Sequence, residues 1–160
     1  MGEPAVSLTL RVDNVSHDLV AEPFELLVDT LRDRLAKRGV KIGCREGICG
    51  TCNVLIDGDL VRSCLVLAVQ AEGREITTSE GLGSRSDLHP LQEEFIAKGA
   101  IQCGFCTPGF LVAAAALLAE QRSPVGRRDL ADGLSGTLCR CTGYEKIVDA
   151  VAAAFTRDGP

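Results

Sequence analysis

The chain has 160 residues and a formal net charge of −5 at pH 7, with its basic residues scattered, so it lacks the basic patch that binds nucleic acid. With no Trp, one Tyr and five Phe, it also lacks stacking platforms for bases. The longest apolar run, 110–119, is too short to span a bilayer, which takes about 20 residues. The N-terminus lacks the basic start and apolar core of a signal peptide, so we expect a cytoplasmic protein.

The first predicted elements are a hairpin and a helix. Residues 6–12 alternate between apolar and polar side chains, which is the period of a half-buried strand. Asp13–Asn14 then supplies turn chemistry for a hairpin. Leucines spaced by four residues over 27–35 form one helical face, and Gly39 is placed to end that helix.

Strands are predicted again after residue 53. Asp57–Gly58 is a tight-turn signal between the apolar segments 54–56 and 60–61, so these segments predict a second hairpin. Residues 74–78 are a candidate final strand. The first half of the chain therefore reads as strands with one helix.

The second half has helical periodicity. The pattern predicts four helices, at 88–96, 108–120, 127–134 and 147–155. Gly99 would end the first of them, and Thr107–Pro108 has the residues of an N-cap followed by Pro at the first helical position. The Gly- and Ser-rich segment 81–87 reads as a linker between two domains, 1–80 and 81–160.

All eight cysteines fall into two quartets. In a reducing cytoplasm they are better metal ligands than disulfide partners. The quartets are Cys44, Cys49, Cys52 and Cys64, then Cys103, Cys106, Cys139 and Cys141. The first has the C-x4-C-x2-C spacing, with a distant fourth cysteine, that is typical of a plant-type [2Fe-2S] site. Zinc is the alternative, although zinc sites usually use two separate knuckles.

Glycines within and before the first cysteine loop fit the same interpretation. Gly43, Gly47 and Gly50 let the backbone wrap a compact cluster through conformations with positive φ. Such turns point amide N–H groups at the sulfurs, which stabilises the reduced cluster. Arg45 could add a positive charge near the cluster, and a solvated side chain at the loop tip is the alternative.

The second quartet consists of two close pairs that folding must bring together. Cys103 and Cys106 precede one predicted helix, and Cys139 and Cys141 precede the last. The partial positive charge of a helix N-terminus favours thiolates and an anionic cluster. The spacing alone leaves a cluster and zinc both open, while a redox dithiol is disfavoured because two pairs are present.

Four segments together resemble one known family. They are 43–52 (Gly-Cys-Arg-Glu-Gly-Ile-Cys-Gly-Thr-Cys), His89–Pro90, 102–109 (Gln-Cys-Gly-Phe-Cys-Thr-Pro-Gly) and 138–144 (Leu-Cys-Arg-Cys-Thr-Gly-Tyr). They closely resemble the iron-sulfur subunit of molybdenum hydroxylases, a family that includes xanthine dehydrogenase, aldehyde oxidoreductase and aerobic carbon monoxide dehydrogenase. The resemblance spans almost the whole chain, with the segments in the family's order.

This resemblance implies an α+β chain: a ferredoxin-like β-grasp domain with one [2Fe-2S] cluster, followed by a four-helix domain with a second. It therefore favours iron over zinc at both quartets. It implies an oxidoreductase subunit without substrate chemistry of its own. Electrons would pass from molybdopterin on a large subunit, through both clusters, to FAD on a medium subunit or to another acceptor. A dimer of heterotrimers is the assembly expected from the same resemblance.

The resemblance also implies roles for single residues. Gln102 and the ligand Cys141 would approach the pterin, while the alternative for Gln102 is a polar residue bonded to backbone at a helix end. His89 is expected to cap or pack a helix rather than to bind metal, because eight cysteines fill both sites. Thr137 departs from the family, which commonly has Asn there, and Arg45 stands where small or acidic residues are frequent.

Two rival functions stay open at this point. A stand-alone electron carrier would meet its partners transiently and would have no pterin to contact, so Gln102 and the C-x-C pair favour a subunit. A structural zinc protein would be colourless. A permanent subunit is expected to expose apolar patches when isolated, whereas a carrier should stay monomeric.

Overall fold

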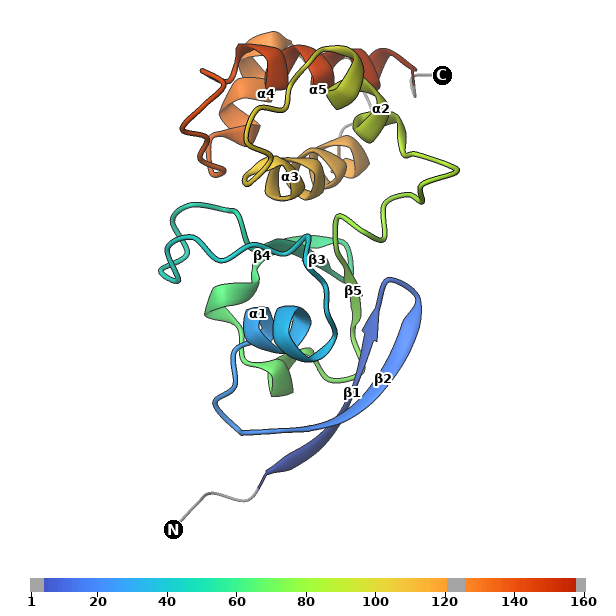
Figure 1. The fold of residues 1–160 in the computed structure, drawn as a ribbon, viewed down its shortest axis with the longest axis vertical. Coiled ribbons are helices and arrows are strands. Elements are labelled where there is room, and N and C mark those ends of the chain that lie inside the picture. The colour runs from blue at the N-terminus through green and yellow to red at the C-terminus, as the bar shows by residue number, and fades with distance from the viewer. Residues whose placement is uncertain (1–4, 121–125, 158–160) are drawn as a thin grey trace.

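The computed structural model describes residues 5–120 and 126–157 and arranges them as a sheet-bearing half followed by a helical half (Figure 1). Each half packs around its own set of buried apolar side chains. The segment 81–89 between them contains no helix or strand, as predicted for a linker. The placing of a domain boundary between residues 80 and 81 stays a prediction.

Five strands form one mixed sheet in the order β2-β1-β5-β3-β4. The strands are β1 (Val6–Val12), β2 (Val15–Ala21), β3 (Asn53–Ile56), β4 (Asp59–Arg62) and β5 (Glu75–Thr77). β1 and β5 are parallel, and the other neighbours are antiparallel. Both predicted hairpins are confirmed, with Asp13 and Asn14 at φ of 51° and 65° in the first turn. Positive φ at both turn residues matches the twist of the strands.

The predicted helix over 27–35 is only partly confirmed. It consists of α1 (Leu27–Asp29) and a π-helical turn, η1 (Thr30–Arg34). It ends before Gly39, because Ala36 takes the left-handed conformation with φ of 56° and the Lys37 amide closes back on the Leu31 carbonyl at 2.8 Å. The prediction that Gly39 ends the helix was wrong.

Gly39 has a different role. A Cβ on this residue would lie 2.5 Å from the Ser79 hydroxyl oxygen, and its amide donates to a Glu80 carboxylate oxygen at 2.6 Å. The glycine therefore permits a close approach between the segment before the cysteine loop and the end of the sheet-bearing half.

The helical half contains four helices, as predicted. They are α2 (Pro90–Ala97), α3 (Thr107–Glu120), α4 (Arg127–Leu134) and α5 (Glu145–Arg157). Thr107 is already the first residue of α3 rather than its N-cap, a shift of one residue at a helix end. His89 caps α2, since its Nδ1 accepts a hydrogen bond from the Leu91 amide at 3.2 Å. Gly99 follows α2 with φ of 61°, as predicted.

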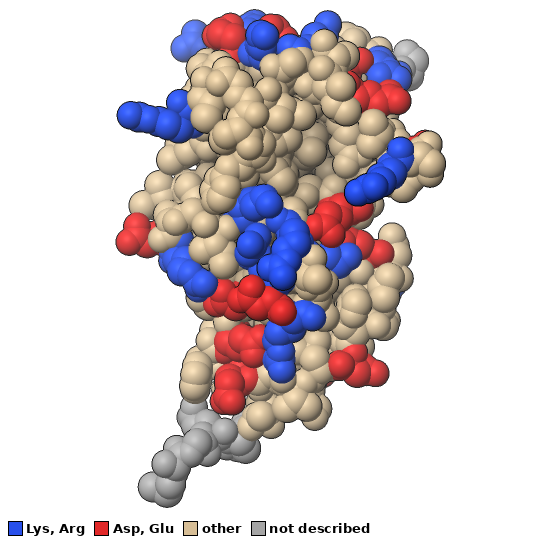
Figure 2. Space-filling model, in the orientation of Figure 1, with Lys and Arg blue, Asp and Glu red and all other residues tan. Residues whose placement is uncertain are grey.

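The two halves meet where α3 lies against β3 and β4 (Figure 1). The linker crosses on one side of this junction, and the loops that contain most of the cysteines lie on the other side. Figure 2 shows Lys and Arg gathered on the sheet-bearing half near this junction, while much of the helical half on the same face is uncharged. Within the described residues, no helix is long and apolar enough to cross a membrane.

Candidate metal centres

The β3–β4 hairpin brings the last two cysteines of the first quartet together. Asn53 pairs with Arg62 in the antiparallel register, so the residues just outside the hairpin also face each other. Ser63 donates to the Cys52 carbonyl through its amide at 3.3 Å and its hydroxyl at 2.7 Å. Cys52 and Cys64 are both buried at this end of the sheet.

The loop that precedes β3 is wound around the sulfur of Cys44. Arg45, Gly47 and Gly50 all have positive φ, between 58° and 75°. The amides of Glu46 and Cys49 donate to the Cys44 sulfur at 3.3 and 3.4 Å. The predicted positive φ is confirmed at Gly47 and Gly50 but was wrong at Gly43, and Arg45 takes such a conformation instead. The predicted inward-pointing amides are present.

Arg45 is held in place by an ion pair. Its guanidinium donates to both carboxylate oxygens of Asp29, at 2.7 and 2.9 Å, with each side chain partly exposed. A bidentate pair of this kind fixes the orientation of the side chain. The arginine thus ties the cysteine loop to α1 instead of standing free at the loop tip.

The four thiols of the first quartet contact one another as two pairs, Cys44 with Cys49 and Cys52 with Cys64. The amides of Glu46 and Cys49 lower the pKa of the Cys44 thiol to about 7. Burial raises the pKa of Cys52 to about 11. The Cys44 thiol is thus prepared for deprotonation by amide donors, whereas the buried Cys52 thiol needs a nearby cation to hold it as thiolate.

The second quartet lies at the starts of two helices. Cys103 and Cys106 precede α3, and Cys139 and Cys141 precede α5. The sulfurs of Cys103 and Cys141 are 3.5 Å apart, and the thiol of Cys106 contacts that of Cys139. Folding therefore joins the two sequence pairs crosswise, as a shared site requires.

Hydrogen-bond donors surround the sulfur of Cys139. The amides of Cys141 and Thr142 each donate to it at 3.4 Å, and the Thr142 hydroxyl donates at 3.0 Å. Burial raises the pKa of Cys139, but these donors outweigh burial and lower the pKa overall. Burial dominates at Cys106 and raises its pKa to about 12.

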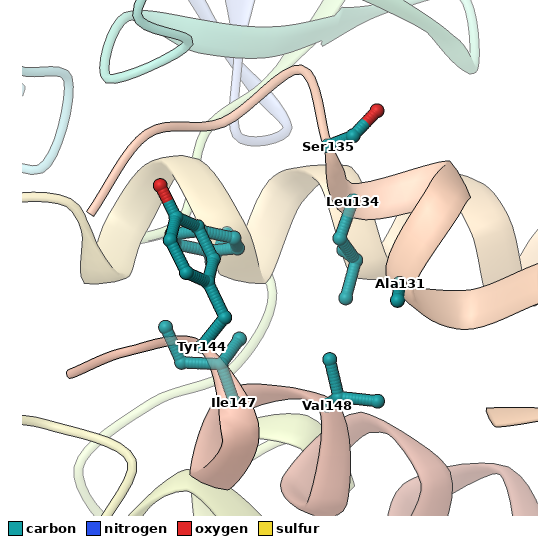
Figure 3. A pocket seen from close by; sticks show the side chains of 7 residues that line it. Ala131, Leu134, Ser135, Tyr144, Ile147 and Val148 are labelled. Carbon is teal, nitrogen blue, oxygen red and sulfur yellow. The ribbon is translucent and has the colours of Figure 1, made fainter. Parts of the chain in front are cut away.

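Tyr144 supports the same turn. Its phenol oxygen accepts a hydrogen bond from the Cys139 amide at 2.9 Å, and its φ of 70° is unusual for a bulky side chain. The ring packs edge-on against Phe110 with centroids 6.1 Å apart. Tyr144 also lines a cavity of about 260 Å³ with residues of α4 and α5 (Figure 3), and its hydroxyl points away from the Ile147 and Val148 side chains.

The second quartet has an exposed edge. Cys103 and Cys141 are exposed, whereas Cys106 is buried. Gln102, the residue predicted to approach a pterin, is exposed beside Cys103. Gln102 and Cys141 are both exposed, and Cys103, the neighbour of Gln102 in the chain, contacts Cys141. A role of Gln102 and Cys141 toward a pterin stays a prediction.

These residues fit two-iron clusters. Each quartet presents two pairs of thiols, and in a [2Fe-2S] cluster two protein ligands bind each iron. Amide donors at the sulfurs are the further feature that such clusters use.

Models of two iron-sulfur domains match the chain. A 2Fe-2S iron-sulfur cluster binding domain matches residues 10–82, and a [2Fe-2S] binding domain matches residues 78–152. A 6-hydroxypseudooxynicotine dehydrogenase complex subunit beta from Paenarthrobacter nicotinovorans is 47% identical over 94% of each chain. The xanthine dehydrogenase iron-sulfur-binding subunit from Escherichia coli O157:H7 is 42% identical over 91% of this chain and 92% of its own length.

This chain belongs to the iron-sulfur small subunits of the molybdenum hydroxylase family. A crystal structure of quinoline 2-oxidoreductase from Pseudomonas putida 86 agrees, with a TM-score of 0.89 and 43% identity over 98% of this chain and 99% of that one. As a member of the family, the chain is a subunit of an oxidoreductase. The predicted fold, a β-grasp domain followed by a helical domain, is confirmed.

Sequence reasoning missed the residues that join the two sites. Asn53 donates to the Gly109 carbonyl and to the Thr137 hydroxyl, each at 3.1 Å. Arg62 donates to Asn53 and to the Gly136 carbonyl, at 2.5 and 2.7 Å. The available signal was a polar Asn directly before the predicted strand 54–56, and the structure extends β3 to include it although Asn is disfavoured in strands.

Proposed function

We propose that this chain relays electrons from a molybdopterin site on a large subunit, through two [2Fe-2S] clusters, to FAD on a medium subunit or to another acceptor. Cys44, Cys49, Cys52 and Cys64 would hold one cluster, and Cys103, Cys106, Cys139 and Cys141 the other. When bound, each cluster takes up a single electron and passes it on. The observation that carries the proposal is the meeting of all eight thiols in four pairs at two neighbouring sites.

The chain's own groups would stabilise the charge that an added electron brings. Amides of Glu46 and Cys49 point at the first site, and amides of Cys141 and Thr142 point at the second. Donors aimed at ligand sulfurs favour the more negative, reduced state. Buried ligands such as Cys52 keep water from one side of the site.

The second site is the better candidate for the end that faces the molybdenum centre. Gln102, Cys103 and Cys141 are exposed together, so a partner's cofactor could approach them without rearrangement of this chain. Apolar side chains beside the cysteines are also exposed, which is the composition of a protein interface. They are Ile101, Phe105, Leu138 and Tyr144.

The first site would face the acceptor. Ile48 and Leu65, next to its cysteines, are each 61% exposed, so they offer an apolar rim around this site as well. The chain would then bind one partner at each end of the relay. A dimer of heterotrimers is the assembly we propose.

Purification from the native source tests the partner part of this proposal. The chain would be tagged at its C-terminus, isolated without oxygen, and analysed for co-purifying polypeptides, molybdenum, flavin and iron. We expect one large chain with molybdenum in stoichiometric amount and one chain with flavin. Recovery of a monomeric iron protein without molybdenum would contradict the subunit role and would favour a stand-alone carrier.

A further inference from the structure

A buried asparagine lies at the junction between the two halves. Asn53 follows the ligand Cys52 directly and is 2% exposed. Its amide nitrogen donates to the Gly109 carbonyl in α3 and to the Thr137 hydroxyl in the turn before Cys139. Its amide oxygen accepts from Arg62, which also donates to Gly136. One side chain thus joins three segments, each of which contains cysteines or adjoins them.

The same segments are in close backbone contact. A Cβ on Gly109 would lie 2.4 Å from the Gly50 carbonyl oxygen, and one on Gly50 would lie 2.6 Å from the Gly136 carbonyl oxygen. The Leu138 amide also donates to the Cys49 carbonyl at 2.9 Å. No side chain separates the two cysteine sites at these points, so their spacing depends on contacts between backbones.

Contacts between backbones do not by themselves fix how the segments of the two halves are aligned, so a side chain that hydrogen-bonds to both halves is needed. The Asn53 amide uses both its donor and its acceptor atom, so it is a fully bonded polar group in a buried position. Removal of such a group leaves the Gly109 carbonyl and the Thr137 hydroxyl without that donor. Because the site excludes water, the unpaired groups lower the stability of the folded chain. Thr137 itself is 1% exposed.

We propose that Asn53 and Arg62 are positioning residues that hold the second cysteine site at a fixed distance from the first. They act through the carbonyl groups of Gly109 and Gly136 and through the hydroxyl of Thr137. Their effect on electron transfer rests on the proposed function, because it assumes a cluster at each site. Their effect on the junction between the halves does not depend on it.

Two measurements on the full chain test this inference with Asn53→Ala, and with Arg62→Gln as a milder second variant. Hydrogen exchange of the Leu138 amide reports the opening of the junction. The magnetic interaction between the two reduced clusters, measured by EPR, reports their separation. Thr30→Val is the matched control, because Thr30 is also fully buried and its hydroxyl donates to Glu25 and Leu26 within its own half.

We expect exchange at Leu138 to become about tenfold faster in Asn53→Ala, since buried hydrogen bonds are lost, and the magnetic interaction to weaken while the iron content is retained. Arg62→Gln should change the exchange rate and the magnetic interaction in the same direction. If Asn53→Ala does not fold, the result for Arg62→Gln decides the test. Thr30→Val should change neither. Unchanged exchange and interaction in the junction variants, or equal changes in Thr30→Val, would overturn the proposal.

The two proposals fail in different ways. If wild-type protein lacks one of the clusters, the relay fails, and the exchange rate at Leu138 still reports on the junction. If both clusters are present but the junction variants behave as wild type, only the positioning role of Asn53 and Arg62 is lost.

Discussion

The amide of Leu138 donates to the carbonyl of Cys49 at 2.9 Å, so a backbone hydrogen bond connects the two cysteine loops directly. Leu138 immediately precedes Cys139 in the chain. A short path of covalent bonds and one hydrogen bond therefore runs between a cysteine of the first site and a cysteine of the second. This proximity gives the relay proposal its structural basis and makes several consequences measurable.

Loss of one cluster should leave the other. The halves have separate cores, so Cys64→Ser is expected to remove about two iron from the first site, and Cys106→Ser about two from the second. Iron analysis with EPR would show which signal is lost, and each variant is the control for the other. Loss of all iron from either variant would contradict independent sites.

Substitution of Gly109 by alanine should weaken the junction between the two halves. Its Cβ would meet the Gly50 carbonyl oxygen at 2.4 Å, and this backbone atom cannot move as a flexible side chain does. We expect Gly109→Ala to lower the free energy of unfolding by roughly 1–3 kcal/mol, as overpacking does. Denaturant unfolding is the measurement.

Gly133→Ala is the matched helical control for this prediction. Its Cβ would meet the flexible end of Leu117 at 3.0 Å, and alanine favours a helix more than glycine does. The free energy of unfolding should change much less than in Gly109→Ala. Equal stability of the two variants would show that the glycine contact with the cysteine loop is unimportant.

In the sheet-bearing half, the strand at 6–12 and the two strands on either side of Asp57–Gly58 could be predicted from local signals. Alternation in 6–12 and the Asp57–Gly58 turn act over a few residues, so they could be recognised in the sequence. The end of the first helix could not, because Ala36 adopts a left-handed conformation that its residue type does not favour. Tertiary contacts determine the backbone conformation at such a position.

The candidate sites were predictable to different degrees. The spacing from Cys44 to Cys64 is a local signature, whereas the crosswise pairing of Cys103 with Cys141 depends on how the helical half brings together the segments before α3 and α5. Contacts of Asn53 across 84 residues with Thr137 have no signature within one sequence. Knowledge of the family supplied the cluster type, and the structure supplied the junction.

Tyr144→Phe should weaken the second site selectively. The substitution keeps the ring against Phe110 but removes the oxygen that accepts from the Cys139 amide. Loss of such a bond costs about 1 kcal/mol, so iron should leave the second site faster on treatment with a chelator. The first site, followed by its own EPR signal, is the internal control. Equal rates of iron loss in variant and wild type would contradict this role of the hydroxyl.

The cluster-free chain should show unequal thiol reactivity. The pKa of Cys44 is lowered to about 7, so at pH 8 this group is mainly thiolate, while Cys52, with a pKa raised to about 11, is mainly thiol. The thiolate is the nucleophile, so iodoacetamide should modify Cys44 more than about tenfold faster. Peptide mass spectrometry over time measures both rates, and urea-unfolded chain is the control. Equal rates in the folded chain would contradict the difference in environment.

Iron and sulfide analysis of the purified chain, combined with low-temperature EPR of its dithionite-reduced form, tests the central claim most directly. The account predicts about four iron and four sulfide per chain, with two distinguishable signals. Zinc in place of iron, or a single signal under fully reducing conditions, would contradict the two-cluster relay.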